Sequence, residues 1–343
     1  MVYTVSSSEK LRKSASDTET KALLYLLGYH PNKEEIFYFV VDFFNDLTGM
    51  DNMADNIWDV QSKGASNPSP REIGKELVTL FKNFVSEIKF TQYILFTNGV
   101  SNTLRKDTQL EVFDSNNINA KALLSLRSGL KEECTQKTYI DNNTITDENL
   151  DSFIKKVTFV IGGKNPPDYI RPIIQAELKT EPTDDILEAI FNEIRNAQSS
   201  KKNTVVEHIV ISTPDEAINY QRHITSNEIK LLIINRIINR DPLAPGCPIP
   251  FMEVYQKFPP ETKNDQLEEC KNDLARALFN KNNGKAFWEL FAEIYKIIIE
   301  NKKFGVEEIF LNIPKRIKRE NSDFDVLSLK YFISTIKEGL GKW

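Results

Sequence analysis

Two patterns of apolar residues alternate over roughly the first 200 positions, and each predicts a different kind of element. Short runs rich in β-branched and aromatic residues are typical of buried strands. Such runs occur at 36–44, 57–63, 93–96 and 158–161. Apolar positions spaced three and four residues apart predict helices, and these fall at 18–27, after Ser69, near 119–132, at 147–155 and at 184–197. The order β-β-α-β-α-β predicts an α/β sheet domain.

The second predicted strand, Ile57–Lys63, is expected to lie antiparallel to the first, after a turn rich in Gly, Asn and Asp. Side chains alternate between the two faces of a strand, so Asp59, Gln61 and Lys63 share one face. This polar face is where chemistry could lie. The helix that follows has a strong start signal, because Ser69 can cap it and Glu72 completes a capping box.

The pattern changes near residue 204, where strand-like runs become rare and long helical patterns take over. These patterns cover 226–239, 264–280, 285–301 and 325–338. The polar stretch Gln198–Asn203 is the predicted boundary, which gives a sheet domain at 1–203 and a helical domain at 204–343. The helix at 285–301 has a broad apolar face. That face predicts either the core of a helical bundle or an interface with another protein.

Composition excludes several classes of protein. The chain has 343 residues, 40% of them hydrophobic, so it can bury a core and is not disordered by default. Lys and Arg number 44 against 49 Asp and Glu, a formal net charge of −5, so a polyanion would need a local basic patch. No apolar run reaches 18 residues, and the three cysteines form no CxxC pattern, which predicts a cytoplasmic protein. The scattered histidines and the absence of HExxH and GxSxG give no basis for a zinc protease or a hydrolase triad.

Positive charge follows the second predicted strand. Arg71, Lys75 and Lys82 come soon after Lys63 and could contact phosphates without reading sequence. Alternatively, Lys75 and Lys82 form the solvent-exposed face of an amphipathic helix. The densest basic run of the second domain, at 314–320, could also contact DNA or simply end a surface helix.

The most informative combination of polar residues is Asp46, at the end of the first predicted strand, with Gln61 and Lys63 on the second. Oxygen ligands can hold a hard cation such as Mg²⁺ against a phosphate, and a lysine can steady the charge that develops during phosphodiester cleavage. Gln and Lys two residues apart are also common on a solvated strand face. Spacing alone therefore leaves both interpretations open.

The stretch 43–100 resembles the nuclease domain of the PD-(D/E)xK endonucleases that act as effectors in bacterial anti-phage defence. It is most similar to the double-stranded-DNA endonucleases of cyclic-nucleotide-activated (CBASS) systems and to their relatives in Lamassu systems. In that group the second acidic position of the motif is often glutamine, so Gln61 and Lys63 match the QxK. Asp46 matches the first metal-binding aspartate. The resemblance is weaker over the rest of the first 200 residues and does not extend to the helical domain.

The resemblance implies a restriction-endonuclease-like sheet domain, a Mg²⁺ or Mn²⁺ cofactor and a catalytic set of Asp46, Gln61 and Lys63. Asp46 and Gln61 would bind the metal, and Lys63 would contact the scissile phosphate or the attacking water. Asp42 and Asp59 compete as metal ligands, and Glu19 is a candidate from the first helix. The alternatives are a solvated strand residue for Asp59 and a first-turn acid that complements the helix dipole for Glu19.

The expected function is therefore that of a metal-dependent double-stranded DNA endonuclease, the effector subunit of a Lamassu-like system. It would be controlled by an SMC-like ATPase complex, by another sensor subunit or by homo-oligomerisation, without a membrane. Gln61 in place of an acid keeps an alternative open, a non-catalytic DNA-binding or scaffold subunit with a decayed nuclease fold. Cleavage of RNA is a third reading of the same motif.

Overall fold

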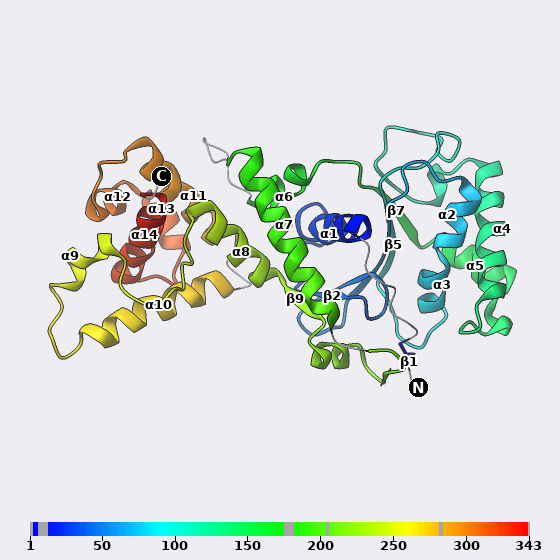
Figure 1. Ribbon diagram of the computed structural model, residues 1–343, viewed down its shortest axis with the longest axis horizontal. Coiled ribbons are helices and arrows are strands. Elements are labelled where there is room, and N and C mark those ends of the chain that lie inside the picture. The colour runs from blue at the N-terminus through cyan, green and yellow to red at the C-terminus, as the bar shows by residue number, and fades with distance from the viewer. Residues whose placement is uncertain (1–2, 6–12, 175–181, 204–205, 281–283, 342–343) are drawn as a thin grey trace. The chain divides into compact units, whose positions relative to one another are not determined.

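The computed structural model describes residues 3–5, 13–174, 182–203, 206–280 and 284–341 (Figure 1). The chain divides into two compact units, and each unit is built from two segments. The first unit comprises Met1–Tyr169 and Phe191–Ser226, and the second comprises Ile170–Ile190 and Asn227–Trp343. The expected boundary at Gln198–Asn203 falls inside the first unit.

A mixed sheet of seven strands forms the centre of the first unit, which makes the chain an α/β protein. Its order is β6-β7-β5-β4-β3-β2-β9. The strands are β2 (Tyr38–Val41), β3 (Leu47–Met50), β4 (Ile57–Lys63), β5 (Gln92–Thr97), β6 (Val112–Phe113), β7 (Val157–Ile161) and β9 (His223–Thr225). Neighbours β4, β5 and β7 are parallel, and all other pairs are antiparallel. A separate two-stranded sheet pairs β1 (Tyr3–Thr4) with β8 (Val210–Ile211).

The first predicted strand is wrong in its length, and its pairing with the second is wrong as well. Asp42 has a backbone φ of 52°, in the left-handed region, and it interrupts the run after Val41. The stretch expected to be only a turn contains β3, which lies between β2 and β4 and pairs antiparallel with both. Strands β2 and β4 therefore run in the same direction. Strand β3 was missed because LTGM is short and has the glycine of a turn.

Helices cover both faces of this sheet (Figure 1). Helix α1 (Lys13–Gly28) packs on β3 and β4 from one side, and the other side carries α2 (Pro70–Glu76), α3 (Val78–Phe84), α4 (Ala120–Gln136) and α5 (Asp147–Ile154). The capping box predicted at Ser69 and Glu72 is confirmed. The helix that it starts is not continuous, because it breaks at Leu77 into α2 and α3. Coverage on both faces explains why nearly all of β4 is buried.

Helices α2 and α4 approach each other unusually closely. A Cβ added at Gly74 would lie 1.9 Å from the carbonyl oxygen of Leu126, and one added at Gly129 would lie 2.1 Å from that of Arg71. Backbone can pack against backbone here only because both positions lack a side chain. This contact positions α2 beside the end of β4.

The second unit is mainly helical, as predicted. Helices α6 (Pro166–Ile174) and α7 (Asp184–Ser200) each contribute residues to both units. The others are α8 (Ser226–Ile238), α9 (Met252–Tyr255), α10 (Lys263–Phe279), α11 (Gly284–Glu300), α12 (Val306–Asn312), α13 (Lys315–Glu320) and α14 (Val326–Leu340). The apolar face of α11 is buried, and the ring of Phe287 stacks on Phe324 and Phe332. The interpretation of this face as a bundle core is confirmed.

Short 3₁₀ turns complete the described chain, at Ser115–Asn117, Asn142–Thr144, Lys201–Asn203, Pro214–Tyr220 and Ile249–Phe251. No helix within the described ranges is both long and apolar enough to cross a membrane.

Candidate functional site

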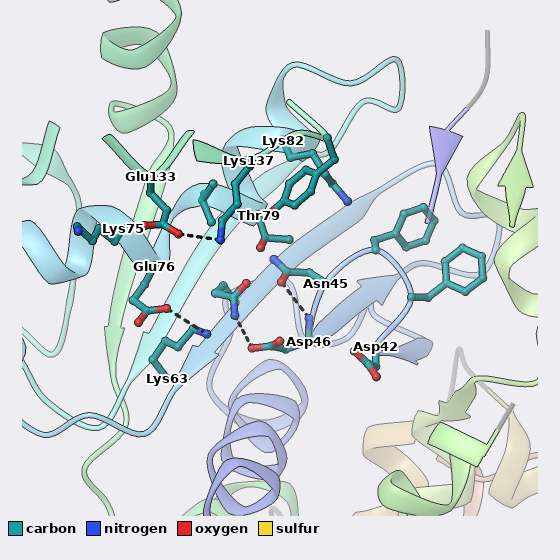
Figure 2. A pocket seen from close by; sticks show the side chains of 15 residues that line it. Asp42, Asn45, Asp46, Lys63, Lys75, Glu76, Thr79, Lys82, Glu133 and Lys137 are labelled. Carbon is teal, nitrogen blue, oxygen red and sulfur yellow. Dashed lines mark hydrogen bonds and ion pairs between the residues drawn. The ribbon is translucent and has the colours of Figure 1, made fainter. Parts of the chain in front are cut away.

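A pocket of about 430 Å³ opens where the loop between β2 and β3 meets the end of β4 and the helices α2 and α3 (Figure 2). Asp46, Gln61 and Lys63 all line it. The loop contributes Asp46, and β4 contributes the other two from one face of the strand. The structure thus brings together the three residues singled out from the sequence.

Hydrogen bonds hold the Asp46 carboxylate rigidly at the start of β3. Its Oδ2 accepts from Gln61 Nε2 at 2.7 Å, from the Ser62 backbone N–H at 2.8 Å and from the Ser62 hydroxyl at 3.0 Å. The backbone N–H of Asp46 donates to Asn45 Oδ1 at 3.0 Å. Strand alternation places Ser62 on the face of β4 opposite Gln61 and Lys63, and no role was assigned to it from the sequence, yet its backbone N–H and its hydroxyl both donate to Asp46.

Burial raises the pKa of Asp46 above its ordinary value, and the nearby charge of Asp42 adds to this. Lys63 and the two bonds from Ser62 act in the opposite direction. An ionised Asp46 is therefore incompletely compensated by the protein. A bound cation would favour the ionised form.

Lys63 forms an ion pair with a residue that the sequence analysis missed. Its Nζ lies 3.0 Å from Oε2 of Glu76, the last residue of α2 (Figure 2). Both side chains are partly exposed, so the pair is weak and exchangeable. Nothing local in the sequence marks Glu76, because only the packing of α2 beside β4 brings it to Lys63.

Two further acids lie near Asp46. The carboxylate of Asp42 lines the pocket, 3.6 Å from the guanidinium of Arg222, which is itself buried. Glu19 lies 2.6 Å from Lys202, and burial raises the pKa of Glu19 to about 7, with small contributions from Asp46 and Asp42. The first-turn interpretation of Glu19 is wrong, because α1 begins at Lys13 and the side chain is buried.

Asp59 is fully buried, so its interpretation as a solvated strand residue is wrong. It does not line the pocket. Asn83 of α3 donates to its Oδ2 at 2.7 Å, and burial raises the pKa of Asp59 to about 7. The same Asn83 accepts from the Tyr3 hydroxyl at 2.9 Å, so a buried polar network lies beneath the pocket.

Lys82 connects this network to the pocket. Its Nζ donates to the Tyr3 hydroxyl at 2.6 Å and lies 4.7 Å from the centre of the Tyr3 ring. Burial lowers the pKa of Lys82 to about 8, against the influence of Asp59. Lys82 lines the pocket and is partly buried, so it is not a fully solvent-exposed helix residue.

The remaining candidate basic residues are paired with acids on α4. Lys75 lines the pocket and lies 3.0 Å from Glu132, which also binds Arg71 at 2.6 Å. Arg71 itself does not line the pocket. The basic run at 314–320 belongs to α13 in the second unit, where Arg316 is exposed and pairs with Glu320.

The donor set at the pocket fits a hard cation. Asp46 offers a carboxylate and Gln61 an amide, and Mg²⁺ is commonly held by one or two protein carboxylates together with water and substrate phosphate. The described residues contain no group of three or more His, Cys, Asp or Glu placed to hold a metal. The Mg²⁺ arrangement needs fewer protein ligands than such a group.

No cysteine or histidine is among the described residues that line the pocket. Cys134, Cys247 and Cys270 are free, and two of them are buried. His30 is buried and bonded to Gln92, as expected for a structural histidine. Comparison of the chain with protein-family models, with curated proteins and with solved structures gave no match.

Proposed function

We propose that the first unit is a metal-dependent endonuclease of the PD-(D/E)xK fold that cuts double-stranded DNA. The observation that carries the proposal is the convergence of Asp46, Gln61 and Lys63 on one pocket of about 430 Å³. A hard-cation donor set and a lysine beside it are the parts that phosphodiester hydrolysis needs.

In the proposed reaction water attacks the scissile phosphorus, the P–O bond to the leaving sugar oxygen breaks, and that oxygen takes up a proton. Asp46 and Gln61 would hold Mg²⁺ or Mn²⁺ beside this bond. When bound, the cation supplies Lewis-acid stabilisation of the phosphoryl oxygens. Lys63 contacts the scissile phosphate and stabilises the negative charge that grows on it. Because the Lys63–Glu76 ion pair is partly exposed, a substrate phosphate can take the place of Glu76. Ser62 keeps the Asp46 carboxylate oriented, and Asn45 accepts from the Asp46 backbone N–H.

The proposal extends to the second unit, whose helices would form a regulatory module. We place the chain as the effector of a Lamassu-like anti-phage system, held by an SMC-like ATPase complex or another sensor subunit. The physical argument for such control is the hazard that an unregulated DNA endonuclease poses to its own cell.

The direct test is cleavage of supercoiled plasmid in Mg²⁺, in Mn²⁺ and in EDTA. We expect nicking and linearisation that require the metal and that fall at least about 100-fold in Asp46→Asn and in Lys63→Ala, because each removes a group that acts on the transition state. Asp55→Asn and Lys89→Ala are matched controls, since both residues are exposed and lie outside the pocket. Cleavage by the site variants at the wild-type rate would reject the site.

A non-catalytic DNA-binding subunit is the competing function, and one observation favours it. Gln61 supplies a neutral amide, and its nitrogen already donates to Asp46. Isothermal titration of Mg²⁺ and Mn²⁺ into the wild type and into Asp46→Asn separates the two functions. Millimolar or tighter binding that is lost in Asp46→Asn supports the nuclease, whereas no binding with or without DNA supports the scaffold. Parallel assays on duplex DNA and on RNA assign the polymer.

A further inference from the structure

Four lysines line the pocket, and one of them differs from the rest. Lys63 pairs with Glu76, Lys75 with Glu132, and Lys137 with Glu133 at 2.8 Å. Lys82 has no carboxylate within ion-pair distance among the described residues. It donates instead to the hydroxyl of Tyr3.

An ammonium group that is partly buried and lacks a counter-ion carries a cost unless something compensates it. The nearest carboxylate of the network, Asp59, is bonded to Asn83 instead. A lysine has three N–H donors, and the Tyr3 hydroxyl accounts for one of them. The others are available to an anion that enters the pocket.

The position of Lys82 is also defined by the fold. Tyr3 belongs to β1, which is anchored by its pairing with β8, and the Tyr3 hydroxyl lies within hydrogen-bond distance of Phe44 O and Asn83. This hydroxyl in turn accepts from Lys82. The network therefore fixes the ammonium on a wall of the pocket that Asp46 and Lys63 also line (Figure 2).

We propose that Lys82 binds a phosphate that flanks the scissile phosphodiester, so that the site takes a polynucleotide strand rather than a single nucleotide. This inference rests on the proposed nuclease function and adds a second phosphate position to it. Lys63 would act at the bond that is cut, and Lys82 would hold the neighbouring backbone of the same strand. Phosphate contacts of this kind position the strand without reading its bases.

The test measures the affinity for a 20-base-pair duplex in Ca²⁺ at a series of salt concentrations. Each phosphate contact contributes roughly 0.9 to the slope of log K against log salt. Lys82→Met removes the charge and keeps most of the side-chain volume, Lys82→Arg keeps the charge, and Lys89→Met is the exposed control. We expect weaker binding by Lys82→Met, with a slope of log K against log salt smaller by about 0.9. Lys82→Arg and Lys89→Met should keep the wild-type slope. A merely structural role would lower the melting temperature without changing this slope.

A second measurement avoids any folding defect. In the wild-type protein, bound duplex should protect Lys82 from an amine-reactive label, as read by mass spectrometry, and should leave Lys89 unprotected. If the wild type binds DNA but Lys82 is not protected and Lys82→Met keeps the wild-type slope, the inference is wrong and the nuclease proposal stands. If the wild type binds no DNA, both are rejected.

Discussion

Asp59 of the first unit carries a carboxyl group that is completely buried. It has no exposed surface, and the bond from Asn83 compensates only part of the cost of its burial. Burial raises its pKa from 3.8 to about 7. A carboxyl group in that position prefers to carry a proton under conditions where it would be ionised in water.

This pKa predicts how stability depends on pH. Between about pH 4 and pH 7 the folded protein binds a proton at Asp59 that the unfolded chain releases, so this group makes stability fall as the pH rises. Asp59→Asn imitates the protonated form at every pH. Near pH 4 the variant and the wild type should have the same free energy of unfolding. From there to about pH 7 the variant should gain stability relative to the wild type, by at most about 1.4 kcal/mol per pH unit. Above about pH 7 the difference should stay constant.

Chemical unfolding between pH 4 and pH 8.5 measures this difference. Asp55→Asn, at an exposed position, should show no such trend. A difference between Asp59→Asn and the wild type that stays flat with pH would contradict the assignment of a raised pKa to Asp59.

At the scale of elements, the close packing of α2 on α4 positions much of the pocket wall. Helix α2 carries Glu76, and the two glycines at 74 and 129 allow backbone of one helix to touch backbone of the other. Helix α4 in turn carries Glu132 and Glu133, which pair with Lys75 and Lys137. The arrangement of charges around Lys63 therefore depends on the backbone-to-backbone contact between α2 and α4.

Replacing either glycine by alanine should be destabilising here, although alanine in a helix interior is normally favourable by about 1 kcal/mol. The added Cβ at Gly74 meets backbone at 1.9 Å, so the helices must move apart. We expect Gly74→Ala and Gly129→Ala each to lower the free energy of unfolding by about 1–3 kcal/mol. Gly64→Ala is the control, since its Cβ would lie at an ordinary 3.4 Å from a side-chain oxygen of Thr18. Equal or higher stability in the two helix variants, measured by denaturant unfolding, would count against the close contact.

At the scale of the whole molecule, each of the two units has its own buried core. The chain enters the second unit at Ile170, returns to the first at Phe191 and leaves it again after Ser226. This exchange supplies β9 to one edge of the main sheet and β8 as the partner of β1. Arg222, from the same returning segment, donates to the backbone oxygens of Asp42 and Lys202 and so supports the loop that carries Asp46.

Because each unit has its own core, core substitutions should act locally. Phe291→Ala removes a fully buried ring from α11 and should cost about 3–5 kcal/mol. We expect faster amide hydrogen exchange in α10, α11 and α14 of that variant, with the central sheet strands unchanged. In Gly74→Ala we expect faster amide hydrogen exchange in the first unit, with α10, α11 and α14 unchanged. Acceleration of equal size in both units for either variant would mean that the units unfold as one.

Local patterns determined much of this protein. The periods of apolar residues predicted the strands β4, β5 and β7 and most of the long helices, and the Ser69 signal predicted where α2 begins, because these features depend on residues close in sequence. The tertiary structure decided what depends on distant partners. It inserted β3 between β2 and β4, buried Asp59, partly buried Lys82 and brought Glu76 to Lys63. Strand pairing and burial are settled by contacts between segments that the local pattern does not encode.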